Sequence, residues 1–275
     1  MQSSLYSRSL IAAAVLCVTT LLPQASNATI VEFELSDGTF IEVNLYDNAT
    51  PQTVANFLNY VQNGNFSQSV IHRSVAGFVI QGGGFVTDVN AQLSAIPENA
   101  PVNNEPTFSN VRGSIAMAKL GSGPDTATSQ WFFNLANNAA NLDNQNGGFT
   151  VFGEVTGTGM ATIDAVAALP TFDLSATLGG AFTDIPLQNY TAADFNNNVP
   201  RISDNFVIIT AITVTDTNPD SAGAAGLNPA LSTANNGGGG NGGGGGGGGG
   251  GSLGLLALLG LSALGRRRYR IAKAA

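Results

Sequence analysis

Cysteine and histidine are almost missing from this chain, which has one of each among its 275 residues. The usual zinc sites need three or four Cys or His ligands, and no EF-hand spacing of Asp and Asn is present. A Ser-His-Asp triad would have to use His72, and no Gly-x-Ser-x-Gly elbow presents a serine to it. Because Cys17 lies at the extreme N-terminus, disulfides and thiolate catalysis are also excluded from the body. We expect no metal, no cofactor and a structural His72.

Positive charge is scarce as well, and its scarcity limits the partners. Between the two ends of the chain only Arg73, Arg112, Lys119 and Arg201 are basic, against eighteen acidic residues, a net charge of −14 for that stretch. Such a surface repels phosphate backbones, so we expect no nucleic-acid partner. Gly82-Gly83-Gly84 lacks the lysine and helix start of a phosphate loop, and it predicts tight turns or close backbone approach instead.

Residues 1–28 have the composition of a secretory signal peptide. Arg8 supplies the positive start, Leu10 to Leu22 form the apolar run, and Ser26-Asn27-Ala28 places small residues before a cleavage site after Ala28. A membrane anchor is the alternative, but this run is short for a membrane span. We therefore expect the mature chain to be exported.

The C-terminal end has a second composition of its own. Residues 218–251 read as a flexible Asn/Gly-rich linker, and residues 252–275 hold a short apolar run followed by an arginine cluster. Fourteen residues of helix span roughly 21 Å, less than the hydrocarbon core. This order resembles the GlyGly-CTERM sorting signals of Gram-negative bacteria, which a rhomboid-type protease removes. The resemblance implies transient membrane insertion of the tail and delivery to the periplasm, outer membrane or cell surface, and a permanent anchor is the alternative.

Residues 29–217 remain, a length suited to one domain. Residues 29–35 and 39–45 predict a β-hairpin around Asp37-Gly38, and residues 50–64 predict a helix with Thr50 as N-cap and Pro51 at the first position. A second helix fits residues 159–169. Further strands are expected at 71–81, 114–118, 130–134, 150–155 and 206–214. Many strands, two helices and no βαβ rhythm predict a closed antiparallel barrel capped by helices, with long loops at 86–110 and 170–204.

The segment from Ile71 to Phe85 is the most informative one. It holds the sole histidine, one of the few body cations and a polar Gln81 among apolar residues. These features predict a pocket for an uncharged ligand around one cation, although an arginine paired with a carboxylate and aromatic residues in a core are the alternative. The candidates are Arg73, Phe78, Val79, Gln81, Met117, Gln130, Phe132 and Leu142.

This segment and four later ones resemble the cyclophilins, in order and spacing, from about Ile30 to Val214. The matching blocks are His72-Arg73, Gly77-Phe78, Gln81-Gly82-Gly83, Gly113 to Ala118, Thr128 to Asn134, Leu142-Asp143 and Val151 to Val155. The resemblance implies a mainly β fold, a closed eight-stranded antiparallel barrel capped by two α-helices. It also implies peptidyl-prolyl cis-trans isomerase activity without cofactor or metal, on proline-containing polypeptides, by a monomer.

The resemblance further implies a role for each site residue. Arg73 would donate a hydrogen bond to the prolyl nitrogen in the twisted transition state. The substrate-binding set would be Phe78, Val79, Gln81, Met117, Ala118, Lys119, Gln130, Phe132, Leu142 and Phe149. Val79 replaces a methionine common in the family, and Asn141 stands where an aromatic residue is common, so we expect reduced activity and poor cyclosporin binding.

Two functions from different classes follow. The first is an exported isomerase that accelerates proline-limited folding, a step otherwise taking tens to hundreds of seconds. The second is a non-catalytic module at the cell surface that binds proline peptides or acts as a chaperone.

Overall fold

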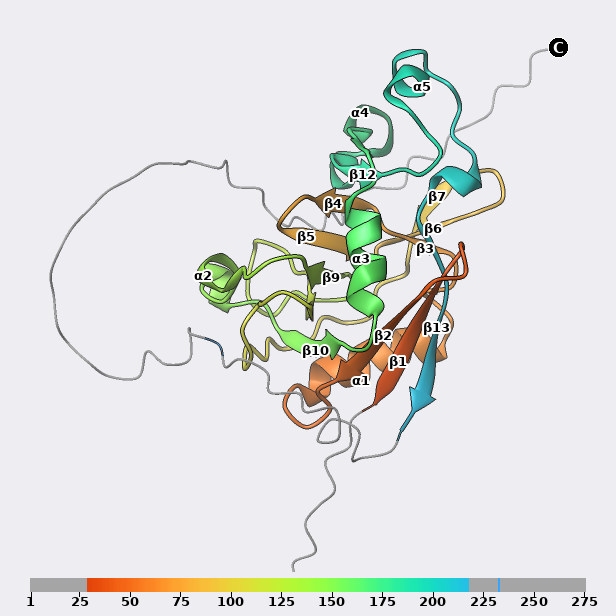
Figure 1. The fold of residues 1–275 in the computed structure, drawn as a ribbon. Helices are drawn as coiled ribbons and strands as arrows, with labels where there is room; N and C mark the ends of the chain where they lie inside the picture. Colours follow the sequence, from red (N-terminus) through yellow and green to blue (C-terminus); the bar gives the residue numbers. More distant parts are fainter. Residues whose placement is uncertain (1–28, 218–231, 233–275) are drawn as a thin grey trace, which may run out of the picture.

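The computed structural model describes residues 29–217 and Ser232 (Figure 1). The predicted signal peptide and the sorting tail lie outside these residues, as does all of the predicted linker except Ser232. Within the described part of the chain, no helix is long and apolar enough to cross a membrane.

One curled antiparallel sheet of eleven strands forms most of the molecule. Its strands, in the order in which they pair, are β4 (Arg73–Val75), β5 (Val79–Gly82), β9 (Trp131–Asn134), β8 (Ser114–Met117), β10 (Val151–Val155), β2 (Phe40–Leu45), β1 (Ile30–Leu35), β13 (Ile208–Asp216), β3 (Ser69–Val70), β6 (Phe85–Thr87) and β7 (Leu93–Ala95). Only two residues separate β3 from β4, yet β3 lies near one end of this order and β4 at the other, so the sheet must curl. The mainly β architecture is as predicted. The sheet has eleven strands where eight were expected, and the β6–β7 hairpin is among them. Its two end strands, β4 and β7, do not pair with each other, so the expected closed barrel is not confirmed.

The first hairpin shows how the sequence pattern produces the sheet. β1 and β2 pair in register, with Val31 opposite Val43 and Phe33 opposite Ile41, and these four side chains are all buried. Gly38 turns the chain with φ of 81°, a conformation that glycine adopts readily. The hairpin is as predicted, and its alternation places one face in the main core.

Two helices longer than two turns occur in the described part of the chain, and both were predicted. They are α1 (Pro51–Gln62) and α3 (Gly159–Ala167), and the short helices are α2 (Ala139–Leu142), α4 (Ser175–Leu178) and α5 (Ala192–Asn196). Helix α1 ends before Gly64, which has φ of 67°. In Figure 1, α1 and α3 lie apart from each other against the curled sheet.

The start of α1 differs from the prediction in one respect. Pro51 occupies its first turn, but the hydroxyl of Thr50 donates to the carbonyl of Tyr46 and does not cap the helix. The carboxylate of Glu105 accepts instead from the amides of Gln52 and Thr53, at 3.3 and 2.9 Å. A residue more than 50 positions away therefore satisfies the first amides of the helix, which lack partners within it.

The prediction of a long loop at 170–204 is wrong. This stretch, the 170–204 segment, folds into short elements: β11 (Thr171–Phe172), α4, η2 (Gly180–Phe182), β12 (Ile185–Pro186), α5 and η3 (Ser203–Asn205). Its buried side chains pack with Val70, Phe206 and Ile208 into a second core, separate from the main one. Elements of two to five residues show no hydrophobic period, which is why the sequence pattern did not reveal them.

Candidate active site

The register of four neighbouring strands places the residues of the candidate site in one row. Arg73 on β4 lies opposite Gln81 on β5, Gln81 opposite Phe132 on β9, and Phe132 opposite Ala116 on β8. Residues directly opposite each other in antiparallel strands share one face of the sheet. The four side chains therefore lie side by side on that face.

Six of the predicted substrate-binding residues belong to one apolar cluster on this face. Val79, Ala118, Phe132, Leu142 and Phe149 are buried in it together with Ala116 and Val151, and Phe78 packs against it. The rings of Phe132 and Phe149 meet edge to face with centroids 5.8 Å apart.

Met117 lies elsewhere. It is two residues beyond Ile115 on β8, so the two share a face, and both belong to the main core with Ile80 and Phe133. The geometry therefore does not bring Met117 to the cluster around Phe132, because strand alternation turns it to the opposite side of the sheet.

Arg73 is the cation of the row, and it is buried, with 6% of its surface exposed. Its Nε lies 3.9 Å from Oδ2 of Asp184, but Nη1 and Nη2 have no hydrogen-bond partner. Burial lowers the pKa of Arg73, and the negative charge of Asp184 acts against that shift. Guanidinium groups remain protonated in proteins, so Arg73 holds two buried terminal nitrogens whose N–H donors are unpaired.

The two glutamines are linked to each other beside Arg73. Nε2 of Gln81 donates to Oε1 of Gln130 at 2.8 Å, and Oε1 of Gln81 is buried without a partner. A buried acceptor left unpaired costs about 1–3 kcal/mol, so such groups often serve a ligand. A prolyl nitrogen could accept a hydrogen bond from Arg73, and a backbone amide of a peptide could donate one to Oε1 of Gln81.

The triple glycine allows Gln130 and Trp131 to approach the backbone. A Cβ on Gly82 would lie 2.6 Å from the Trp131 ring, and one on Gly84 would lie 2.9 Å from Cδ of Gln130. Gly83 has φ of 74°, and a Cβ there would meet the carbonyl of Ser129 at 2.6 Å. Both predicted reasons for the glycines, unusual backbone angles and close approach, are confirmed.

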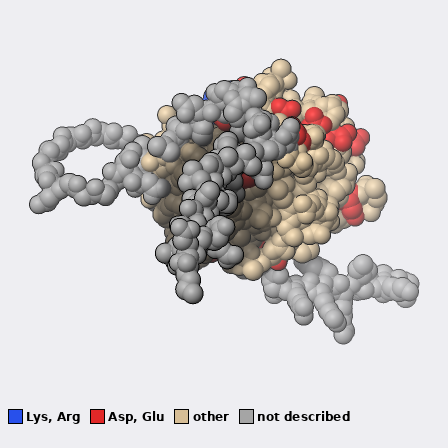
Figure 2. Space-filling model, turned by 90° about the horizontal axis from the view of Figure 1, so that it is seen from below, with Lys and Arg blue, Asp and Glu red and all other residues tan. Residues whose placement is uncertain are grey.

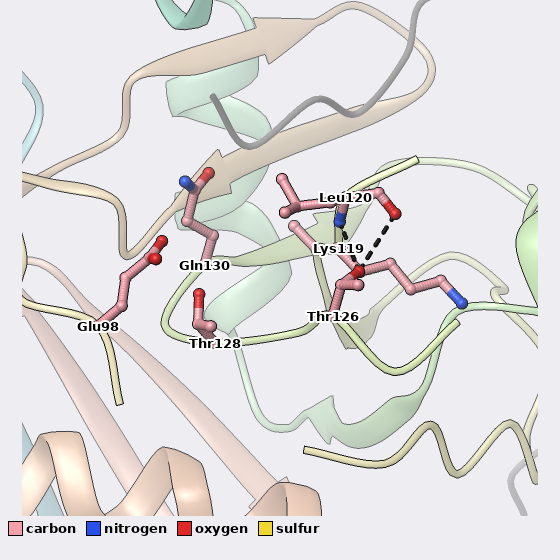
Figure 3. Close-up of a pocket in the computed structure, with 7 residues that line it drawn as sticks. Glu98, Lys119, Leu120, Thr126, Thr128 and Gln130 are labelled. Carbon is pink, nitrogen blue, oxygen red and sulfur yellow. Dashed lines mark hydrogen bonds between the residues drawn. The ribbon is translucent and has the colours of Figure 1, made fainter. Parts of the chain in front are cut away.

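A pocket next to the row continues the site beyond Gln130 (Figure 3). Its lining residues are Glu98, Ala118, Lys119, Leu120, Thr126, Thr128 and Gln130. The side chain of Lys119 points away from Gln130 and Glu98 in this view, and its ammonium donates to the carbonyl of Asn146 at 2.7 Å and to that of Gly148. Burial lowers the pKa of Lys119 to about 8. Only the backbone and stem of Lys119 are therefore offered to the pocket.

His72 adjoins the row but faces aromatic rings. It is 1% exposed, with its ring centroid 5.1 Å from that of Phe85 and 6.2 Å from that of Phe182. Burial, and then the charge of Arg73, lower the pKa of His72 to about 4. The imidazole is consequently neutral at pH 7.

Two carboxylates that support the site were not singled out from the sequence. Asp143 is buried and accepts from the hydroxyl of Ser109 and the amide of Asn110, which ties the turn after Leu142 to a distant loop. Asp184 reaches Arg73 from the 170–204 segment. Asp143 could have been found from the sequence, because it lies in the block Leu142-Asp143 that resembles the cyclophilins. Asp184 could not, because no sequence spacing links it to Arg73. Among the described residues, no group of three or more His, Cys, Asp or Glu is placed to hold a metal ion.

Comparison with known proteins decides the family. Residues 30–191 match the model of the family described as cyclophilin type peptidyl-prolyl cis-trans isomerase/CLD. The chain belongs to the cyclophilin family. This cyclophilin is an enzyme, a peptidyl-prolyl cis-trans isomerase, as the resemblance predicted.

Individual proteins are similar to part of this chain. A peptidyl-prolyl cis-trans isomerase of Acinetobacter baylyi is 41% identical over 146 residues, which are 52% of this chain and 74% of that protein. The peptidyl-prolyl cis-trans isomerase A of Dickeya dadantii is 37% identical over 166 residues, 59% of this chain and 80% of that protein. A solved cyclophilin type isomerase of Cryptosporidium parvum is 20% identical, with a TM-score of 0.47 over 68% of this chain and 99% of that one.

Proposed function

We propose that this cyclophilin isomerises X–Pro bonds of exported polypeptides, with Arg73 as the transition-state hydrogen-bond donor. The observation that carries the proposal is the buried guanidinium whose Nη1 and Nη2 have no partner, in one row with Gln81 and Phe132. Isomerase activity itself follows from family membership, whereas the residue roles and the exported substrates are proposed.

The reaction needs no nucleophile or cofactor. Rotation about an X–Pro bond breaks amide conjugation, and the general peptide barrier is about 18–20 kcal/mol. As the bond twists, the prolyl nitrogen becomes pyramidal and regains a lone pair that can accept a hydrogen bond. A donor placed there binds the transition state more strongly than either planar ground state, which lowers the barrier. Arg73 supplies such a donor in a site that already excludes water from Nη1 and Nη2.

The other residues of the site would hold the substrate. The apolar cluster of Phe78, Val79, Phe132 and Leu142 would receive the proline ring. Gln81, through its unpaired Oε1, and Gln130 would bind the peptide backbone. Ala118 and the backbone at Lys119 would extend that binding into the neighbouring pocket, and Phe149 would close the cluster from the other side.

Export is proposed from the composition of residues 1–28, and surface sorting from residues 252–275. An enzyme outside the cytoplasm that acts on proline bonds would serve the folding of other exported chains. We further propose that it acts as a monomer, with the tail inserted in the membrane until it is cleaved.

The test compares Arg73→Ala with the wild type in a protease-free assay of a proline peptide. We expect kcat/KM to fall about 10²-fold, the usual effect of removing a transition-state donor. Arg73→Lys should recover little, because an ammonium lacks the guanidinium fork. Arg112→Ala is the control, since Arg112 forms an exposed ion pair with Asp164 at 2.7 Å. If Arg73→Ala retained the wild-type rate, the role proposed for Arg73 would be wrong. Peptide binding without any acceleration by the wild type would favour the non-catalytic module.

A further inference from the structure

The 170–204 segment is attached to the free edge of β4, beside Arg73. The amide of Ser74 donates to the carbonyl of Asp184 at 2.7 Å, and Asp184 directly precedes β12. Strand β4 pairs with β5 on its other side. The segment therefore covers the edge strand that carries Arg73, and Figure 1 shows β12 lying next to β4.

This attachment also brings a carboxylate to Arg73. Oδ2 of Asp184 lies 3.9 Å from Nε of Arg73, and no other ion pair of Arg73 occurs among the described residues. The hydroxyl of Thr183 donates to the same Oδ2 at 2.8 Å, which restrains the carboxylate. The contact is made to the Nε side of the guanidinium and leaves Nη1 and Nη2 unpaired.

We propose that Asp184 is a positioning residue, which holds the guanidinium of Arg73 by its Nε edge so that Nη1 and Nη2 stay available to the substrate. The inference rests on the role proposed for Arg73 above. By this inference, the 170–204 segment contributes to the reaction through the negative charge of Asp184.

Physical reasons support a need for this contact. An arginine side chain has many rotamers, and a donor misplaced by about 1 Å can cost about 10²-fold in rate. A buried cation also requires a compensating charge or hydrogen bonds, and Arg73 has no hydrogen bond from its terminal nitrogens. The neighbouring His72 cannot take the place of Asp184, because an imidazole carries no negative charge and this one packs against aromatic rings.

The structure lets the charge of Asp184 be separated from its part in the fold. Its main-chain carbonyl holds the segment to β4, and this bond is unaffected by the side chain. Asp184→Asn removes the charge at nearly constant volume, while Asp184→Glu keeps the charge. Asp173→Asn is the matched control, because Asp173 is an exposed residue of the same segment and accepts from the amide of Ser175 at 2.9 Å.

The experiment measures kcat and KM separately for these three variants, for Arg73→Ala and for the double variant that combines Arg73→Ala with Asp184→Asn. Thermal unfolding of each variant shows whether it is folded. For Asp184→Asn we expect kcat to fall about tenfold, with KM within about twofold of the wild type. Asp184→Glu should recover most of kcat, and Asp173→Asn should match the wild type. The double variant should be no slower than Arg73→Ala alone, because Asp184 acts through Arg73.

Three results would overturn the inference, and they separate it from the proposed function. If Asp184→Asn has the wild-type kcat while Arg73→Ala is slow, Asp184 has no positioning role and the role of Arg73 stands. If Asp184→Asn slows the Arg73→Ala background by the same factor, Asp184 acts through the fold alone. If Arg73→Ala is as fast as the wild type, both the inference and the proposed role of Arg73 fail.

Discussion

Arg73 shows how a single residue can favour reactivity at the expense of stability. Its guanidinium is buried, and its two terminal nitrogens have no partner in the fold. Removing a charge from water costs several kcal/mol unless charges and hydrogen bonds replace the solvent. Here one partly exposed carboxylate does so, and the remaining donors are left for a substrate.

We therefore expect Arg73→Met to stabilise the protein while abolishing most of its activity. An apolar side chain of similar length removes the desolvation cost, and a gain of about 1 kcal/mol in the free energy of unfolding is expected. Urea unfolding followed by circular dichroism measures it, with Arg112→Met as the exposed control. A loss of stability in Arg73→Met would show that the charge contributes to the fold.

His72 predicts a dependence of stability on pH. Burial lowers its pKa to about 4 in the folded protein from the ordinary value of 6.5, so between these values the unfolded chain binds more protons. Stability should then rise with pH through this window and fall as acid is added. The contribution of His72 is about 3 kcal/mol across the whole window, from 1.36 kcal/mol per pKa unit.

The check is urea unfolding of the wild type and His72→Phe at pH 7 and pH 4.5. The variant should lose less stability over this range, because it has no imidazole to protonate. Equal losses in the two proteins would mean that other groups cause the acid effect.

At the scale of elements, the sequence predicted the helices and strands with a regular hydrophobic pattern, but it did not predict which distant residues contact them. The hairpin of β1 and β2, helix α1 and helix α3 follow periods of two and 3.6 residues, and each was predicted from the sequence. The short elements of the 170–204 segment have no period and were missed. Glu105 and Asp184 act on α1 and β4 across more than 50 and 100 residues, and no local pattern encodes such pairs.

The cap of α1 by Glu105 is a prediction at this scale. Glu105→Gln keeps an acceptor but removes the negative charge next to the helix N-terminus, so we expect a loss of about 1 kcal/mol in the free energy of unfolding. Chemical unfolding measures it against Glu34→Gln, an exposed strand residue. If both variants lose the same amount, the cap contributes nothing of its own.

Across the whole molecule, negative charge predominates. On the face shown in Figure 2, Asp and Glu gather toward one side, and hardly any Lys or Arg is seen. The described residues hold four basic side chains, of which Arg73 and Lys119 are buried. An isomerase that contacts its substrate through backbone and proline needs no strong surface charge of its own, which fits this distribution.

The proposal on export is tested by the intact mass of the protein from its native host. We expect a chain that begins at Thr29 and ends near the glycine tract, because both terminal segments would be removed by proteases. A mass that includes residues 266–270 would contradict cleavage of the tail, and one that includes residues 1–28 would contradict the signal peptide.

Of the row across β4, β5, β9 and β8, the sequence singled out Arg73, Gln81 and Phe132 but not Ala116. Local sequence alone determined the hairpin, the two long helices and the turns at the triple glycine. These features depend on short-range periodicity and on glycine, which act within a few residues. The tertiary structure decided the rest: the eleven strands, the second core in the 170–204 segment and the turn of Met117 away from the site. It also decided which carboxylate meets Arg73, since contacts between distant segments depend on how the sheet curls and on which edge is left free to be covered.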